Sequence, residues 1–378
     1  MKIKINKKIK YIHIPNNLRN DFDYDVVIVG GGPAGSCTAR YIYPRLNNLR
    51  VLIIDEKKNI GIPINCGEAI SLENYRFPLD IFDLSELFNF PNYLIAHKIK
   101  KFQIISPNGK IIDIPYLGYM IYRDLFDRYL LKLALNEGTN LKTETKFFKF
   151  KNNHTIETNK GEISSKIIVG ADGPTSKVAK NFGLKTPLSY GICAFAQIEG
   201  DFHNNTMKMY LGKQFNKGYG WIFSKGDHAN VGVGTEFKTK KPIKMILNDF
   251  IKNKLLLSPK NIFFEGQGIV PTSGPIPETI RDNILIVGDA AGMVYPDSGG
   301  GIIPAMIAGK QCGTAIWRHL ILGEPLNYYE IRWKRILENR YKKGLQIKKK
   351  YQWFLKYDMF SEIFFKLKRY SIKRRNKR

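Results

Sequence analysis

Hydrophobic residues along this chain form short unbroken runs that alternate with helical segments, the pattern of an α/β fold. The runs Val26–Val29, Val51–Ile54 and Ile284–Val287 have the length and composition of strands buried on both faces of a parallel sheet. Helices are expected over Ala34–Tyr43 and Ile303–Leu320. We therefore expect a Rossmann-like domain in which helices cover a parallel sheet.

The remaining segments predict a second sheet and a helical C-terminal region. Short β-like stretches at 101–106 and 110–115 flank the turn Pro107-Asn108-Gly109, which is the signal of a hairpin. A helix is expected from Tyr122 to Asn136. Residues 186–265 alternate more and predict a separate, mainly antiparallel sheet. Further strands are expected at 143–149, 154–158 and 165–169, and helices over 324–378.

These elements predict a discontinuous cofactor domain with an inserted substrate domain. The expected bounds are a basic N-terminal extension over 1–23, the cofactor domain over 24–76, 116–185 and 266–320, the substrate domain over 77–115 and 186–265, and a C-terminal helical region with a basic tail over 321–378.

Three glycines after the first predicted strand have the spacing G-x-G-x-x-G of a dinucleotide-binding turn. Gly30 permits a tight turn, Gly32 lets the backbone approach a pyrophosphate, and Gly35 lets the helix pack closely on the strand. Pro33 and Ala34 begin that helix, whose N–H groups would face the phosphates.

Two acids, Asp55 and Glu56, close the second predicted strand. Asp55 lies 20 residues after Gly35, the spacing at which such a turn places an acid on the ribose hydroxyls. The stretch predicts a dinucleotide site, and it does not choose between FAD and NAD.

Composition and charge exclude several classes of protein. None of the apolar runs approaches the roughly 18 residues of a membrane span, and the first ten residues lack the apolar stretch of a secretory signal. The four cysteines (Cys37, Cys66, Cys193, Cys312) form no C-x-x-C pair, which argues for a reducing compartment and against a metal site or disulfides. The net charge of +27 suits an anionic membrane or a phosphate-bearing lipid, or reflects AT-rich codon bias; nucleic acid is not expected, since no module for it is visible.

A loop with Gly61, Pro63, Cys66 and Gly67 leaves the carboxyl end of the second strand, the end at which open α/β sheets bind ligands. Cys66 and Gly67 are therefore candidates to act beside the nucleotide; the alternative is a small buried thiol in a loop. Arg123, at the start of the Tyr122–Asn136 helix, is expected to face a phosphate or, alternatively, to pair with Asp127.

Two later stretches carry further candidate chemistry. Tyr219, Trp221 and Phe223 suit a flat wall over a planar or apolar ligand, with an aromatic strand core as the alternative. Gly288 and Asp289 follow a buried strand, so that the acid can reach sugar-chain hydroxyls. The helix start at Gly300, Gly301 and Ile302 then offers N–H groups to an anion or a flavin carbonyl.

With these motifs in order, residues 24–315 resemble the FAD-dependent oxidoreductases with the para-hydroxybenzoate hydroxylase fold. Gly30–Gly35 with Asp55 looks like their Rossmann start, Gly170-Ala171-Asp172-Gly173 looks like their D-G motif, with Asp172 at the cofactor, and Gly288-Asp289-Ala290-Ala291-Gly292 looks like their G-D motif. The resemblance implies FAD as the cofactor.

Within that group the chain resembles the geranylgeranyl reductase family. Pro63–Glu68 is similar to its P-x-x-C-G/A-E/G motif beside the flavin, and Pro296–Ile302 is similar to its P-x-x-G-G-G-I segment. Tyr219–Phe223 is similar to its Y-x-W-x-F-P motif in the substrate pocket, although Ser224 replaces the proline. Arg123 lies in R-x-x-F-D, which is similar to the helix start expected near FAD.

The resemblance implies saturation of the C=C bonds of geranylgeranyl chains, on archaeal ether phospholipid precursors such as digeranylgeranylglyceryl phosphate. Cys66 is then the candidate to donate a proton or to tune the flavin, an ordered water being the alternative, and the aromatic wall would line the prenyl chain. NAD(P)H or a ferredoxin would supply electrons. The competing hypotheses are an aromatic-ring monooxygenase of the same fold and a non-catalytic flavoprotein or lipid-binding module.

The C-terminal tail has the pattern of a basic amphipathic helix. Trp353, Tyr357, Phe360, Phe364 and Leu367 recur at spacings of four and three, and 366–378 holds eight Lys and Arg without an acid. This pattern favours binding at a membrane surface; the alternative is a helix face packed on the catalytic domain and a solvated tail. We expect a cytoplasmic protein that is peripheral on the inner face of the cell membrane.

Overall fold

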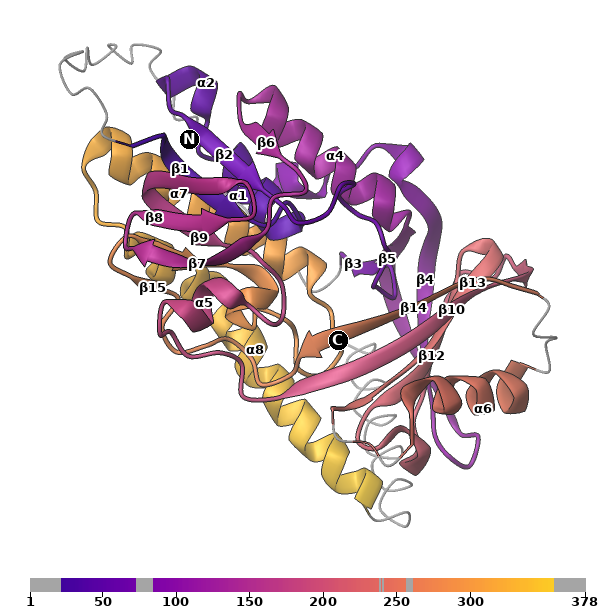
Figure 1. Ribbon diagram of the computed structural model, residues 1–378. Coiled ribbons are helices and arrows are strands. Elements are labelled where there is room, and N and C mark those ends of the chain that lie inside the picture. The colour runs from indigo at the N-terminus through magenta and orange to yellow at the C-terminus, as the bar shows by residue number, and fades with distance from the viewer. Residues whose placement is uncertain (1–21, 73–83, 238, 240, 256–260, 357–378) are drawn as a thin grey trace, which may run out of the picture.

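The computed structural model describes residues 22–72, 84–237, 239, 241–255 and 261–356, and this part of the chain forms two sheets in two halves of the molecule (Figure 1). The first sheet has the strand order β15-β16-β9-β1-β2-β6, and the hairpin β7-β8 extends it through β9. Its central strand β1 pairs in parallel with β2 and β9. The strands are β1 (Tyr24–Val29), β2 (Val51–Ile54), β6 (Asn140–Lys142), β7 (Phe147–Asn152), β8 (Thr155–Thr158), β9 (Gly161–Gly170), β15 (Ile280–Arg281) and β16 (Ile284–Ile286).

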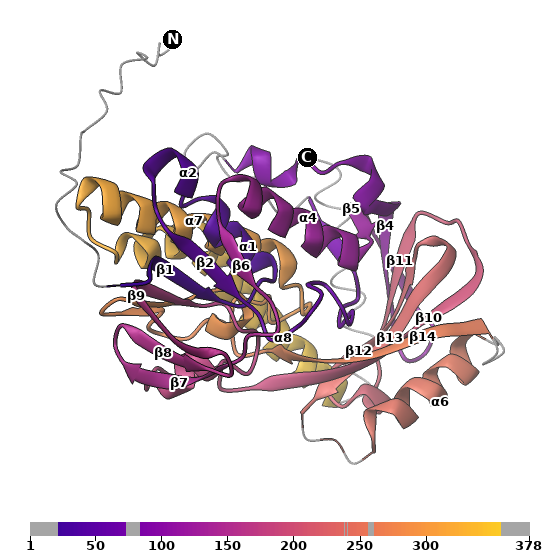
Figure 2. The same cartoon turned by 45° about the horizontal axis from the view of Figure 1, so that its top comes forward.

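Helices α1 (Pro33–Arg40), α4 (Arg123–Asn136) and α7 (Ile302–Leu322) lie together over one face of the first sheet (Figure 2). The apolar runs of β1 and β2 are fully buried beneath them, as the unbroken runs predict. Because the carboxyl ends of β1, β2 and β9 meet at one edge, the glycine turn, Asp55 and the 170–173 turn all lie at that edge.

The second sheet is mainly antiparallel and has the order β14-β10-β13-β12-β11-β4-β5-β3, in which only the β11–β4 pair is parallel among the described strands. One face packs on α6 (Ile243–Leu255) through Ile246, Leu247 and Phe250. The strands are β3 (Ala69–Ser71), β4 (Ile95–Ile105), β5 (Ile111–Ile121), β10 (Tyr190–Phe202), β11 (Thr206–Tyr210), β12 (Tyr219–Ser224), β13 (Gly226–Glu236) and β14 (Ile262–Pro271).

The long helix α8 (Tyr328–Lys356) connects the two halves (Figure 1). Arg340 makes a bidentate ion pair with Asp297, in the loop before α7, at 3.0 Å for each contact. About three helical turns further along α8, Tyr351 donates a hydrogen bond to the carbonyl oxygen of Gly218, beside β12 (2.5 Å). The shorter elements are α2 (Pro44–Asn47), α5 (Lys177–Asn181) and the 3-10 turns at Ser85–Phe88, Asn92–Leu94, Lys213–Phe215 and Gly288–Ala291.

Three expected elements differ from the structure. The helix expected over Ala34–Tyr43 ends at Arg40, because Pro44 disfavours helical backbone in the residue before it, and Tyr43 has a φ of 51°. The strand expected over 143–149 is wrong: β6 ends at Lys142, a turn with Glu144 at a φ of 52° follows, and β7 begins at Phe147. Helix α6 lies inside the region expected to be sheet.

Some segments also pair differently from the expected division of the chain. Strand β3, the second half of β5 and the second half of β14 belong to the second sheet, although the expected bounds place 69–71, 116–121 and 266–271 in the cofactor domain. The domain bounds themselves stay a prediction. The N-terminal extension up to residue 21 and the tail from residue 357 lie outside the described residues.

Candidate active site

The glycine turn after β1 is closely packed at two glycines and open at the third. A Cβ atom on Gly30, which has a φ of 107°, would lie 2.3 Å from the Ala171 carbonyl oxygen, and one on Gly35 would lie 1.9 Å from the Gly30 carbonyl oxygen. A Cβ atom on Gly32 would meet nothing within 4 Å. Asp55 accepts a hydrogen bond from the Gly31 amide (2.8 Å), which ties the turn to the end of β2. The backbone at Gly32 is therefore accessible to a ligand at the start of α1.

The turn at Gly288 and Asp289 packs against the same helix start. A Cβ atom on Gly288 would lie 2.7 Å from the Ala34 Cβ, and one on Gly301, before Ile302 begins α7, would lie 3.0 Å from Asp289 Oδ1. Within the described part of the chain, the Asp289 carboxylate accepts no hydrogen bond. Burial raises the pKa of this carboxyl group to about 6, against the positive charge of Arg123. A buried acid without a protein donor can accept hydrogen bonds from the hydroxyls of a ligand.

Two acids that the sequence predicts at the cofactor have partners within the protein. Asp172 accepts hydrogen bonds from Ser176 Oγ (2.6 Å) and from the amides of Lys177 (2.7 Å) and Val178 (3.0 Å), so its carboxylate caps α5. Glu56 is 60% exposed and pairs with Lys146 at 3.2 Å. Contact of either acid with a cofactor stays a prediction, as it does for Pro33 at the first position of α1 and for Gly300 in the loop before α7.

The Cys66 loop meets the aromatic wall, defined as Tyr219, Trp221 and Phe223 on one face of β12. A Cβ atom on Gly67 would lie 3.4 Å from the Phe223 ring and 3.8 Å from Trp221 Nε1. The Trp221 and Phe223 rings stack with centroids 6.0 Å apart, and the Tyr219 hydroxyl donates to the Ser298 carbonyl oxygen at 2.5 Å. The wall therefore joins the Cys66 loop to the glycine-rich loop before α7, although these segments are far apart in the sequence.

The Cys66 thiol lies between groups of opposite charge. Its sulfur accepts a hydrogen bond from the Glu68 amide (3.2 Å), and Arg123 lies beside it from the start of α4. Burial raises the pKa of the Cys66 thiol, while the positive charge of Arg123 and the Glu68 N–H oppose that rise. Arg123 Nε also donates to Asp127 (2.7 Å), which is the alternative partner that the sequence left open. The thiol is therefore protonated at neutral pH.

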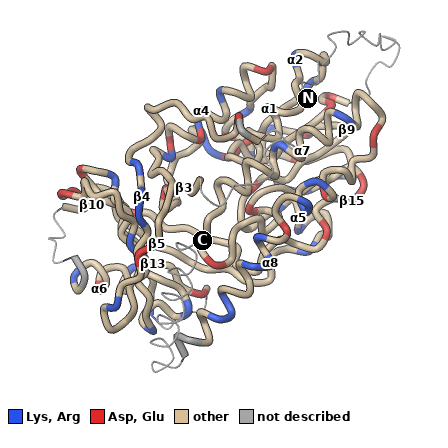
Figure 3. Tube along the Cα trace, turned by 180° about the vertical axis from the view of Figure 1, so that it is seen from behind, with Lys and Arg blue, Asp and Glu red and all other residues tan. Residues whose placement is uncertain are grey.

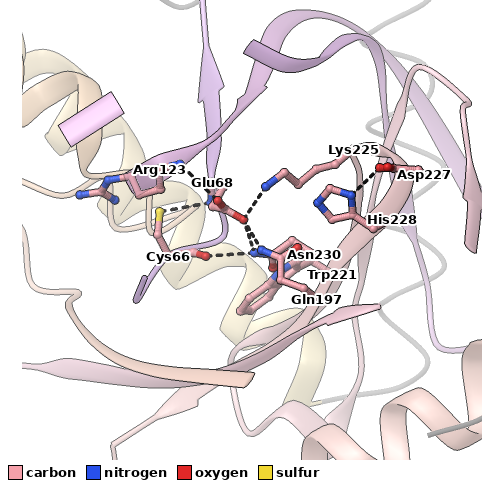
Figure 4. Close-up of polar contacts among 9 residues, drawn as sticks. All are labelled: Cys66, Glu68, Arg123, Gln197, Trp221, Lys225, Asp227, His228 and Asn230. Carbon is pink, nitrogen blue, oxygen red and sulfur yellow. Dashed lines mark hydrogen bonds and ion pairs between the residues drawn. The ribbon is translucent and has the colours of Figure 1, made fainter. Parts of the chain in front are cut away.

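The sequence did not predict the buried polar cluster that surrounds Glu68, next to Cys66. Figure 4 shows Glu68 accepting hydrogen bonds from Lys225 (3.0 Å), Asn230 (3.1 Å) and Gln197. Glu68 stands in the motif around Cys66, but its partners come from the β12–β13 turn, from β13 and from β10. No local spacing relates Lys225 or Asn230 to Glu68, so only the fold brings them together.

The comparisons with known proteins agree with one another. Residues 191–269 match the model of the geranylgeranyl reductase catalytic domain. A digeranylgeranylglycerophospholipid reductase of Methanococcus vannielii is 36% identical over 84% of this chain and 83% of that relative. The chain belongs to the digeranylgeranylglycerophospholipid reductase family.

Solved structures agree with this family at the level of fold. A geranylgeranyl bacteriochlorophyll reductase-like protein from Thermoplasma acidophilum has a TM-score of 0.76 and 27% identity, and the match covers 87% of each chain. The halogenase PltM in complex with phloroglucinol and FAD has a TM-score of 0.67 at 14% identity, covering 87% of this chain and 76% of that one, which shows a shared fold alone. The family indicates a flavin cofactor.

Other kinds of site are not found in the described residues of this family member. No group of three or more His, Cys, Asp and Glu side chains there could hold a metal ion, and all four cysteines are free. None of the described helices is long and apolar enough to cross a bilayer.

Proposed function

We propose that this chain is an FAD-dependent reductase that saturates the C=C bonds of geranylgeranyl chains on ether phospholipid precursors such as digeranylgeranylglyceryl phosphate. The observation that carries the proposal is the position of Cys66, a protonated thiol between the Rossmann edge of the first sheet and the aromatic wall of the second. Family membership supports the same chemistry.

The residues at the Rossmann edge fit FAD. The open backbone at Gly32 and the start of α1 would hold the pyrophosphate, and Asp55 would hold the ribose. The Asp289 carboxylate, which accepts no hydrogen bond from the described residues, would hold the ribityl hydroxyls. When bound and reduced, FAD supplies the hydride for the alkene.

The protein's own part in the reaction is to orient the chain, to exclude water and to deliver a proton. Trp221 and Phe223 are buried and stacked, so they present a flat apolar face to a prenyl chain. The S–H bond of Cys66 breaks as its proton passes to the alkene carbon next to the one that receives the hydride. The thiolate that remains lies beside Arg123, whose charge favours it until solvent returns a proton.

Electrons are proposed to come from NAD(P)H that binds transiently or from a ferredoxin, because FAD occupies the single fingerprint that the sequence contains. A net charge of +27 favours an acidic ferredoxin or an anionic membrane surface. We propose that the protein works in the cytoplasm at the inner face of the cell membrane, where its lipid substrate lies.

An anaerobic reoxidation experiment tests the function. The purified protein, with its flavin reduced by dithionite, is mixed with digeranylgeranylglyceryl phosphate in the absence of oxygen. The proposal expects the flavin absorbance to return as the lipid accepts electrons. A flavin that the lipid does not reoxidise, together with NADPH oxidation and oxygen uptake that begin when a phenol is added in air, would instead identify an aromatic-ring monooxygenase. A flavin that dithionite cannot reduce would indicate a non-catalytic flavoprotein.

A further inference from the structure

A buried ion pair lies behind Cys66 and has no role in the reaction described so far. The side chains of Glu68 and Lys225 are 1% and 3% exposed, and Lys225 Nζ donates to Glu68 Oε2 at 3.0 Å. Removing two charges from water costs several kcal/mol per ion, so a buried pair adds little net stability even when its geometry is good. The presence of this pair beside a reactive thiol therefore points to a contribution other than stability.

The surroundings of Glu68 leave its side chain little freedom. Gln197 and Asn230 donate to the same oxygen as Lys225, and the Arg123 amide donates to the other oxygen at 3.3 Å. The Glu68 backbone has a φ of 61°, in the left-handed region that glutamate rarely adopts. Four donors on the carboxylate thus hold a backbone conformation two residues after Cys66, and that conformation aims the Glu68 N–H at the Cys66 sulfur.

Asn230 connects the pair to both the cysteine and the wall. Its Nδ2 donates to the Cys66 carbonyl oxygen (3.0 Å) and to Glu68, and its Oδ1 accepts from Trp221 Nε1 (2.8 Å), as Figure 4 shows. Because an indole N–H only donates, this contact fixes which end of the amide is oxygen. One fully buried side chain therefore sets the position of Cys66 relative to Trp221.

We propose that Glu68, Lys225 and Asn230, here called the Glu68 assembly, are positioning residues that hold the Cys66 thiol in place opposite the aromatic wall. The proposal rests on the proposed function, in which Cys66 gives its proton to the alkene. The three side chains are not assigned contact with the reacting atoms, and the Glu68 backbone N–H is the contact through which the assembly meets the Cys66 sulfur.

The charges around the thiol predict shifts of the Cys66 pKa in variants of the Glu68 assembly, which a purely structural role would not produce. Glu68 raises the pKa of Cys66 and Arg123 lowers it. Lys225 balances the charge of Glu68, so Glu68→Gln and Lys225→Met should move the thiol pKa in opposite directions, down and up respectively. The titratable groups that face Cys66 from its own loop, α4, β10 and β12 are Glu68, Arg123, Cys193 and Tyr219.

The test measures the rate at which iodoacetamide alkylates Cys66 in the full-length flavoprotein as the pH rises. Peptide mass spectrometry measures the alkylated fraction of the Cys66 peptide at each pH. Glu68→Gln, Lys225→Met and the charge-neutral double variant are compared with Glu86→Gln/Lys310→Met. That control removes another Lys–Glu pair (2.8 Å), in which Lys310 is 9% and Glu86 39% exposed, and which makes no contact with Cys66 among the described residues.

The proposal expects opposite shifts of the alkylation midpoint in the two single variants and an intermediate midpoint in the double variant. It also expects kcat for the lipid to fall about tenfold with KM within about twofold, since the loss is in the reacting geometry and not in lipid binding. The control pair should leave the midpoint unchanged and kcat within about twofold.

Shifts in the same direction, no shifts, or equal effects in the control pair would overturn the proposal. If the single variants do not fold, the double variant decides: wild-type kcat would overturn the proposal, and reduced kcat at unchanged KM would support it. If the wild-type protein reduces no lipid, the proposed function fails, while the alkylation midpoints still test the assembly.

Discussion

At the scale of single residues, the proposed chemistry depends on the thiol of Cys66, which lies beside the positive charge of Arg123. We predict that Cys66→Ser retains its flavin and lowers the rate of geranylgeranyl reduction about tenfold or more, because a hydroxyl is a far weaker acid than a thiol. Turnover of the lipid and the flavin absorbance of the purified variant are the measurements. Unchanged turnover would remove Cys66 from the mechanism and favour a water as the proton source.

Asp289 provides a second prediction, which depends on pH. Burial raises the pKa of its carboxyl group from 3.8 to about 6, so the folded, flavin-free protein binds a proton there more tightly than the unfolded chain does. The free energy of unfolding from this group is therefore greatest below pH 4 and falls as the pH rises towards 6. Flavin-free Asp289→Asn should accordingly be more stable than the wild type above pH 6, by roughly 2–3 kcal/mol.

Denaturant titration of the two flavin-free proteins at several pH values measures this difference, which should shrink towards pH 4. The same variant should retain FAD less well, because an amide replaces a charged acceptor for hydroxyl groups. A stability difference that does not depend on pH would show that Asp289 titrates normally, and with it the case for a buried ligand-facing acid would be lost.

The sequence predicted the residues whose contacts are local and missed those whose contacts are distant. Gly32 and Asp289 stand in short motifs whose spacing predicts the turns that the structure contains, while their contact with a cofactor stays a prediction. Lys225 and Asn230 lie 157 and 162 residues from Glu68, and nothing near them in the sequence marks a buried carboxylate as their partner. Arg123 and Asp172 are a third case: both lie in the predicted turns or helix starts, and their side chains also bind protein groups. Arg123 donates to Asp127, and Asp172 accepts from Ser176.

At the scale of elements, two glycines of the β1–α1 turn have different expected roles: Gly35 is needed for folding and Gly32 for cofactor binding. We predict that Gly35→Ala destabilises the protein, since its Cβ would lie 1.9 Å from a backbone oxygen that cannot move away cheaply. Gly32→Ala has open space and an ordinary φ of −69°, so the flavin-free protein should unfold within about 0.5 kcal/mol of the wild type. Denaturant titration measures both variants.

The Gly32→Ala protein should nevertheless lose FAD retention, because the added methyl occupies the approach of the pyrophosphate. The ratio of flavin to protein after gel filtration measures this loss. Full FAD retention in Gly32→Ala would show that the pyrophosphate lies elsewhere.

Elements whose hydrophobic residues follow one clear helix or strand pattern were predicted well. Elements in segments where helix and strand patterns are mixed were not. The buried runs of β1 and β2 and the helix α4 are where the sequence places them. Helix α6 was missed because it lies within a region dominated by strands. The strand expected over 143–149 failed because its apolar Phe147 belongs to the following hairpin, while β6 ends before it on the edge of the first sheet.

At the scale of the whole molecule, α8 holds the two halves of the candidate site together. Its Arg340 binds the loop before α7, and its Tyr351 binds the backbone beside the aromatic wall. Figure 3 shows Lys and Arg along α8 as well as over both sheets, so basic charge is spread widely and continues in the sequence into the tail. Trp353, near the end of α8, is 51% exposed.

We predict that removal of residues 357–378 weakens binding to anionic lipid vesicles while the folded part stays intact, because each Lys or Arg near an anionic leaflet contributes about 1 kcal/mol. This truncation keeps Tyr351 and the whole described length of α8. Vesicle co-sedimentation at low and high salt is the measurement, with neutral vesicles as the control. Equal binding by the truncated and full-length proteins would assign the tail to solubility.

The central claim is that this chain adds hydrogen to prenyl double bonds. The most direct measurement is mass spectrometry of digeranylgeranylglyceryl phosphate after incubation with the dithionite-reduced enzyme in the absence of oxygen. The account predicts that the lipid mass rises by one hydrogen molecule for each double bond saturated, with a smaller rise for Cys66→Ser. A lipid of unchanged mass, from protein that carries FAD and is fully reduced, would contradict it.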